Sequence, residues 1–176
     1  MEVFIMDEKV MDIFRHIESN NVHALETALV ANSSFANIEN EQGITPLGFA
    51  SHLGNKQAVQ LLLDFSADVN AISHSKIDFI PSNTALHAAI AGARDLEIIE
   101  LLLKNNANPD NVDSNGFTVL HTAAFHDNNQ EIVRLLIEYG ATIDAKINDG
   151  KTAIDIAKEQ GNHQIAEQLQ RYIELA

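Results

Sequence analysis

Four segments of the chain repeat one short pattern at nearly constant spacing. Each copy begins with Thr, has Leu or Ile two residues later, and has Ala five residues after the Thr. The four Thr residues are 39, 34 and 34 residues apart. A period close to 33 residues predicts that one supersecondary unit recurs along the chain and stacks on its neighbours. The copies begin at Thr45, Thr84, Thr118 and Thr152.

A second apolar run follows each copy, with the spacing that places its residues on one face of a helix. In the first three copies Ala or Gly with Asn or Asp comes next, which is the chemistry that ends a helix and begins a loop. Each unit is therefore predicted to be helix, turn, helix and loop. The apolar runs contain Leu61 and Leu62, Leu101 and Leu102, Leu135 and Leu136, and Ile165 and Leu169.

The unequal spacings come from insertions at definite places. Each 34-residue spacing has one extra residue between the two helices of its unit, and the 39-residue spacing has six extra residues in the loop from Ala71 to Asn83. The inserted segment contains Phe79 and Ile80, so this loop is expected to be long and to have an apolar tip. Long loops of this kind are often functional.

The repeated segments resemble the TPLHxA signature of the ankyrin repeat. Thr45-Pro46-Leu47 keeps the Pro, whereas His87 and His121 keep the His. The resemblance covers roughly residues 8 to 173 and implies an all-α ankyrin-repeat solenoid of about five helix-turn-helix repeats, with β-hairpin-like finger loops and N- and C-terminal caps. We expect a tail at 1–7 and one domain at 8–176, with units at about 8–39, 40–72, 73–112, 113–146 and 147–176.

The resemblance also assigns roles to the signature residues. The Thr is expected to cap the first helix of its unit, and Pro46 to occupy the first turn. His87 and His121 are expected to hydrogen-bond within and between neighbouring loops. The Ala positions would let the first helices approach one another, while the Leu-rich second helices fill the core.

The charge of the chain limits its partners. Eleven Lys and Arg against 25 Asp and Glu give a formal net charge of −14, distributed over both halves. Without a cluster of Lys and Arg, we expect neither nucleic acid nor an anionic membrane surface to bind. The acidity favours a protein partner with a basic segment.

Several other features of the sequence bear on class and location. The chain has no Cys, which excludes disulfides and thiolate chemistry. Its apolar runs are too short to cross a bilayer. Glu2, Asp7 and Glu8 stand where a secretory signal would be basic and then apolar. We therefore expect a cytoplasmic monomer, with secretion by another route left open.

The eight His and 25 carboxylates do not form a catalytic pattern. No nucleophile with a neighbouring base, Gly-rich phosphate loop or metal-spaced cluster is present in the sequence. We expect no catalytic, cofactor or metal site, and interpret His16, His23 and His163 as solvated side chains on the cap helices.

In ankyrin proteins partners usually bind along the concave surface formed by the first helices and the loop tips. Ile44, Leu53, Phe117 and Phe125 are apolar at positions of this surface where a merely solvated face would be polar. The resemblance thus selects a partner-binding set: Glu41, Gln42, Ile44, His52, Leu53, Phe79, Ile80, Ser114, Asn115, Phe117, Phe125, His126, Asn148, Asp149 and Lys151.

Two structural alternatives stay open at this point. Phe117 and Phe125 could cover the edge of the core, and the tip of the long loop could fold back on an adjacent finger. For function, we expect a protein-protein interaction module. The alternative is a regulatory or accessory subunit, or a secreted effector, that modulates one dedicated enzyme.

Overall fold

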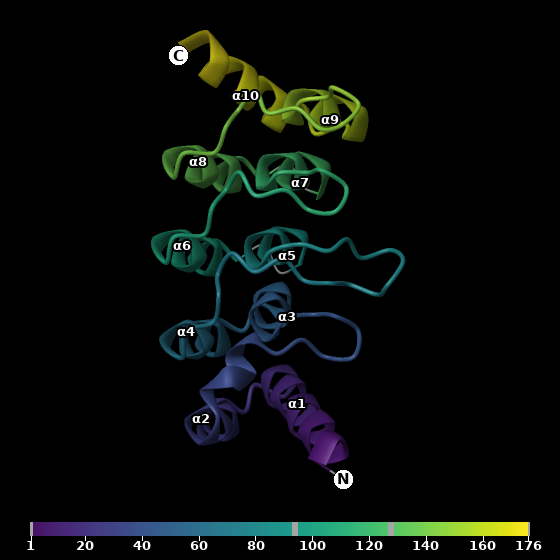
Figure 1. Ribbon diagram of the computed structural model, residues 1–176. Coiled ribbons are helices and arrows are strands. Elements are labelled where there is room, and N and C mark those ends of the chain that lie inside the picture. The colour runs from purple at the N-terminus through teal and green to yellow at the C-terminus, as the bar shows by residue number, and fades with distance from the viewer. Residues whose placement is uncertain (1, 93–94, 127–128, 176) are drawn as a thin grey trace.

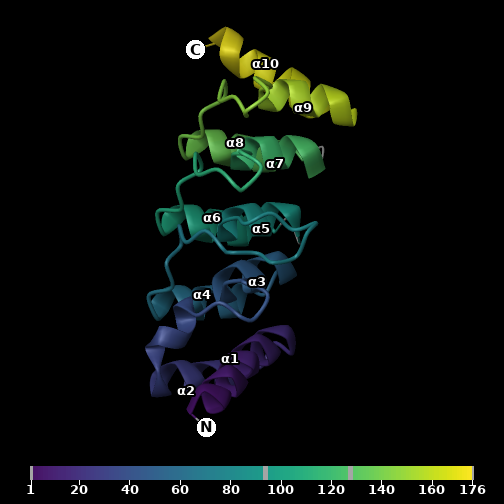
Figure 2. The same ribbon diagram turned by 45° about the vertical axis from the view of Figure 1, so that its right-hand side comes forward.

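The structure, a computed structural model, describes residues 2–92, 95–126 and 129–175. Within these ranges ten α-helices stack as successive pairs in one column (Figure 1), and a view turned by 45° shows the same column (Figure 2). The first helices of the pairs are α1 (Glu2–Glu18), α3 (Pro46–Leu53), α5 (Ala85–Ala91), α7 (Val119–His126) and α9 (Ala153–Gln160). The second helices are α2 (Val22–Ala31), α4 (Lys56–Asp64), α6 (Leu96–Lys104), α8 (Gln130–Glu138) and α10 (His163–Leu175). A 3-10 helix, η1 (Ser33–Asn37), follows α2.

The stacked helix pairs confirm the predicted all-α solenoid. α1 begins at Glu2, so the helix extends into the segment before residue 8, where a tail was expected. Neither Pro nor Gly occurs between residues 2 and 18, so nothing in the sequence interrupts the helix there.

The core runs the length of the column and has two kinds of residue. Small side chains of α3, α5, α7 and α9 allow these helices to lie close together, and larger side chains of the second helices fill the space between units. The buried small residues at one repeated position are Ala50, Ala89, Ala123 and Ala157. The buried large residues at the other are Leu62, Leu102, Leu136 and Leu169.

The signature Thr residues begin the first helices in two different ways. Thr45 Oγ1 accepts a hydrogen bond from the backbone N–H of Gly48 at 3.1 Å, and Thr152 forms a reciprocal capping box with Asp155. Thr84 does not cap through its side chain, contrary to expectation; its hydroxyl bonds His87 Nδ1 at 2.9 Å. The third residue after the Thr decides the outcome, because an imidazole at that position takes the hydroxyl.

Polar side chains also tie each unit to the next. Asn37 Nδ2 donates to the carbonyl of Ser66 at 3.0 Å, and Asn37 Oδ1 accepts from the N–H of Asp68 at 2.7 Å. Asn70 repeats this arrangement one unit further along. These bonds satisfy backbone groups at the end of one unit with a side chain of another, so they fix how the units stack.

Candidate protein-binding surface

Four fingers project from the column on the side of the first helices (Figure 1). Each is a hairpin whose arms are joined by a backbone hydrogen bond, such as Asn40 N–H to the carbonyl of Ile44 at 3.0 Å in the first. The side chain of Asn40 also accepts bonds from the N–H groups of Gln42 and Ile44, which closes the turn. We call them finger 1 (38–45), finger 2 (71–84), finger 3 (111–118) and finger 4 (145–152).

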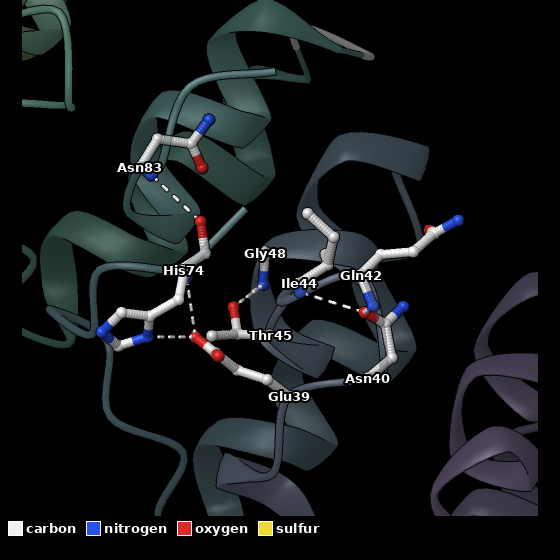
Figure 3. Close-up of polar contacts among 9 residues, drawn as sticks. Glu39, Asn40, Gln42, Ile44, Thr45, Gly48, His74 and Asn83 are labelled. Carbon is white, nitrogen blue, oxygen red and sulfur yellow. Dashed lines mark hydrogen bonds and ion pairs between the residues drawn. The ribbon is translucent and has the colours of Figure 1, made fainter. Parts of the chain in front are cut away.

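Finger 2 is hydrogen-bonded to finger 1 along its first arm. The N–H of His74 donates to the carbonyl of Gly43 at 3.0 Å, and the N–H of Lys76 donates to the carbonyl of Gln42 at 2.9 Å. The Glu39 carboxylate accepts from both the backbone N–H and Nδ1 of His74, each at 2.9 Å (Figure 3). These contacts hold the two fingers side by side.

Finger 3 pairs with the second arm of finger 2. The N–H of Ser114 donates to the carbonyl of Ser82 at 2.9 Å, and the Ser114 hydroxyl accepts from the N–H of Ser82 at 3.1 Å. Fingers 1 to 3 thus form one hydrogen-bonded row. Among the described residues, no backbone hydrogen bond joins finger 3 to finger 4.

Close contact between fingers 1 and 2 depends on glycine at position 43. Gly43 has φ of +74°, and a Cβ there would lie 1.9 Å from the carbonyl oxygen of His74. Gly150 occupies the same turn position in finger 4 with φ of +84°, but a Cβ there would meet no atom within 4 Å. An Ala at either position would strain the backbone, but only an Ala at position 43 would also clash with a neighbouring finger.

We expect Gly43→Ala to lower the free energy of unfolding by about 2 kcal/mol, because the left-handed backbone is strained and the fingers must move apart. Gly150→Ala, which adds strain without a clash, should cost about 1 kcal/mol. Urea unfolding of both variants measures the difference. Equal losses would mean that finger 2 can shift without cost.

His87 and His121 connect first helices to the following fingers. His87 Nε2 lies 2.9 Å from the carbonyl oxygen of Phe117, and His121 Nε2 lies 3.4 Å from that of Lys151. A carbonyl only accepts, so Nε2 carries the proton and Nδ1 accepts from the Thr hydroxyl. Burial lowers the pKa of both imidazoles, which keeps them neutral. These contacts agree with the structural role expected for the two residues.

We call the exposed surface of α3, α5 and α7, which the sequence predicts to be concave, the concave floor. It contains exposed apolar side chains. Leu53 at the end of α3 is 45% exposed, and Phe125 near the end of α7 is 43% exposed. His52 and His126 are exposed beside them. α3, α5 and α7 contain no Asp, Glu, Lys or Arg, so the centre of this floor lacks formal charge in an acidic protein.

A glycine allows the ends of α3 and α5 to pack closely in the middle of the floor. A Cβ at Gly92, which follows α5, would lie 2.2 Å from the carbonyl oxygen of His52. The end of α5 thus lies directly against the end of α3. The sequence contained the glycine, but its role depends on the stacking of two units.

Phe117 and Phe125 could each either cover the edge of the core or be exposed to a partner, and the structure gives them different environments. Phe117 is half-buried and packs against the core, with its ring centroid 5.7 Å from that of His121. Phe125 lies edge-on to Phe117 at 6.3 Å and remains partly exposed. Phe117 therefore covers the core edge, while Phe125 is available at the surface.

The tip of finger 2 is not folded back on its neighbours. The N–H of Ile80 donates to the carbonyl of Ile77 at 3.0 Å, which closes a turn with Asp78 and Phe79 at its corner. Phe79 is 85% exposed, whereas Ile77 and Ile80 are half-buried. In Figure 1 this finger extends furthest from the column.

The remaining residues of the partner-binding set occupy the fingers. Ile44 is half-buried against the core, and Lys151 is paired with Asp149 at 3.4 Å and Glu159 at 3.0 Å. The hydrogen bond that Lys151 Nζ donates to the Glu159 carboxylate is the main cause that raises the pKa of Lys151. The exposed finger residues of the set are Glu41, Gln42, Ser114, Asn115, Asn148 and Asp149.

Most of the set lies on fingers 1 to 3 and at the ends of α3 and α7, and Asn148, Asp149 and Lys151 lie on finger 4. Within the described ranges, no three His, Asp or Glu side chains are grouped so as to hold a metal ion. None of the described helices is long and apolar enough to cross a bilayer. Glu39 and Asp78 were not selected from the sequence. The fold places Glu39 beside His74, 35 residues away, whereas Asp78 directly precedes Phe79 and could have been included with it.

The chain belongs to the ankyrin-repeat family: the sequence pattern described as ankyrin repeats (3 copies) matches residues 13–113 and, again, 86–175. Ankyrin repeats are generally non-enzymatic modules of protein-protein interaction, and no catalytic family is indicated.

Two curated relatives are much longer than this chain. Ankyrin repeat protein FPV014 of fowlpox virus (strain NVSL) is 33% identical over 105 residues, which are 60% of this chain and 22% of the relative. Zinc finger CCCH domain-containing protein 66 of Arabidopsis thaliana is 41% identical over 75 residues, which are 41% of this chain and 12% of the relative. The chain therefore spans less than a quarter of the length of either protein.

Proposed function

We propose that this protein is a monomeric interaction module that binds a protein partner through its concave floor and fingers. The observation that carries the proposal is the uncharged floor between α3 and α7, where Leu53 and Phe125 are each more than two-fifths exposed. Apolar side chains exposed in a concave surface supply binding energy when a partner covers them.

The surroundings of the floor support a partner with basic groups. The net charge is −14, and finger 1 places Glu39 and Glu41 at one margin of the surface. Such charges at the rim speed association and select among partners, whereas the buried apolar contacts supply most of the affinity. A segment with apolar residues flanked by Lys or Arg is the proposed ligand.

The test is affinity purification from cells that express the protein, with the wild type and a Leu53→Asp, Phe125→Asp variant compared quantitatively. Phe117 is left unchanged because its ring supports the core. Val30→Asp is the matched control, since Val30 is 71% exposed on α2, a second helix of the column, and belongs to neither the fingers nor α3, α5 and α7.

We expect the concave variant to retain less than about a tenth of each specific partner, because charges placed in an apolar interface centre cost at least 1.4 kcal/mol. The Val30→Asp protein should retain the partners in full. Circular dichroism establishes that all three proteins are folded. If the concave variant kept its partners, the binding surface would lie elsewhere and the proposal would be wrong.

A further inference from the structure

The tip of finger 2 presents the exposed side chain of Phe79, which we call the knob. The two arms of the finger, which we call its base, are held by hydrogen bonds to the neighbouring fingers. His74 is bonded to Gly43 on one side of the base, and Ser82 is bonded to Ser114 on the other. The turn that presents Phe79 is closed by its own hydrogen bond. Because the base is already ordered, a partner that covers Phe79 would not have to immobilise the finger, and this preserves affinity.

A polar hollow of about 490 Å³ lies beside the knob. Seryl hydroxyls, the Asn115 amide and the Asp78 carboxylate line it, together with the exposed ring of Phe79. These groups are hydrogen-bond acceptors, an anion and an aromatic face, which together suit a Lys or Arg side chain. Lys76 also lines the hollow and would oppose a second cation there.

We propose that the finger 2 tip is an anchor that inserts Phe79 into an apolar pocket of a folded partner, with a Lys or Arg beside that pocket entering the hollow. The inference rests on the proposed function and specifies the partner's chemistry. A side chain at the corner of a projecting turn is convex, so the surface that covers it must be concave.

Charge selects this occupant over the alternatives. Asp78 on the tip and Glu41 on the neighbouring finger outnumber Lys76, and the whole chain has a net charge of −14. This field attracts a basic rim and repels both an anionic lipid surface and a second copy of the chain. Phe79 therefore meets a basic protein surface.

Site-specific photocrosslinking tests the inference in cells that express the protein. The photoreactive residue p-benzoylphenylalanine replaces Phe79, Phe125 or Val30 in three separate proteins. Phe125 reports on the concave floor, and Val30 reports on random contacts of an exposed apolar position. Mass spectrometry identifies the crosslinked molecule and the peptide that was contacted.

We expect position 79 to crosslink one protein at an apolar surface pocket with Lys or Arg at its rim, well above the yield at position 30. With that protein purified, Phe79→Ala should weaken binding by about 30-fold, as for a buried aromatic anchor. Val30→Ala should leave affinity unchanged. Asp78→Asn should slow association and reduce its salt dependence.

The other outcomes each overturn a stated claim. Crosslinks from position 79 to lipid, to a second copy of the chain or to an acidic surface would overturn the anchor. Crosslinks from position 125 without any from position 79 would overturn the anchor and leave the concave-floor proposal standing. If neither position exceeded position 30, both proposals would fail.

Discussion

Leu102→Ala should lower the free energy of unfolding by about 4 kcal/mol, near the upper part of the range for a buried leucine. Leu102 is fully buried in α6, in the middle unit of the column. The substitution removes apolar contacts and leaves a cavity between neighbouring units, and a solenoid is stable only through such contacts. Urea unfolding followed by circular dichroism measures the loss.

Leu96→Ala is the matched control, because Leu96 lies in the same helix but is 38% exposed. It should cost less than about 1 kcal/mol, since the exposed side chain gains little from burial. Both substitutions place Ala, the best helix former, in α6, so neither loss can come from helix propensity. A comparable loss from both variants would show that contacts at the partly exposed start of α6 contribute as much as packing between units, and would contradict the prediction. A small loss from Leu102→Ala would show that the neighbouring units close the cavity.

The column was predictable because its determinants recur in the sequence. A Leu or Ala at a fixed position of each unit has the same neighbours every time, so spacing alone locates Leu62, Leu102 and Leu136 in the core. The insertion was located in the same way, by the distance from Asn70 to Thr84. A periodic pattern thus predicts contacts that are themselves periodic.

Contacts that break the period were not predictable. The bond between Glu39 and His74 joins residues of different units, and among the described residues no other hydrogen bond between fingers repeats it. The signature Thr was expected to cap every first helix, yet Thr84 bonds His87, and Thr118 bonds His121 in the same way. This second difference does follow the repeat, because both units have an imidazole three residues after the Thr, where it competes for the hydroxyl.

The proposed binding surface was also predictable only in part. Their positions in the sequence placed Phe117 and Phe125 together on the side expected to be concave. Only the structure shows that the Phe117 ring packs against the core and that the Phe125 ring is partly exposed. The long finger was located by its insertion, whereas the direction of Phe79 follows from hydrogen bonds to both neighbouring fingers. Exposure is a property of the assembled stack.

His87→Ala should lower the free energy of unfolding by about 3 kcal/mol at pH 7.5, because it removes the buried hydrogen bonds of the imidazole to the Thr84 hydroxyl and the Phe117 carbonyl and also removes packing volume. His87 is 2% exposed and joins Thr84 in its own unit to Phe117 in the next finger. His23→Ala, on the exposed side of α2, is the control and should cost little.

The same histidine should make the protein acid-sensitive. Burial lowers the pKa of His87 below its ordinary value of 6.5, so the folded protein keeps the imidazole neutral while the unfolded chain binds a proton. Stability is thus fully present above pH 6.5 and is lost as the pH falls toward the lowered pKa. His121, whose pKa is also lowered by burial, acts in the same direction.

Urea unfolding between pH 7.5 and 5 measures this loss, and His87→Ala should flatten the pH dependence because the titrating group is gone. The variant is thus less stable than the wild type at pH 7.5, and the gap between them narrows as the pH falls. A constant gap would mean that His87 accepts a proton without unfolding. Nε2 and Nδ1 would then both have to donate, and the Thr84 hydroxyl would have to turn and accept.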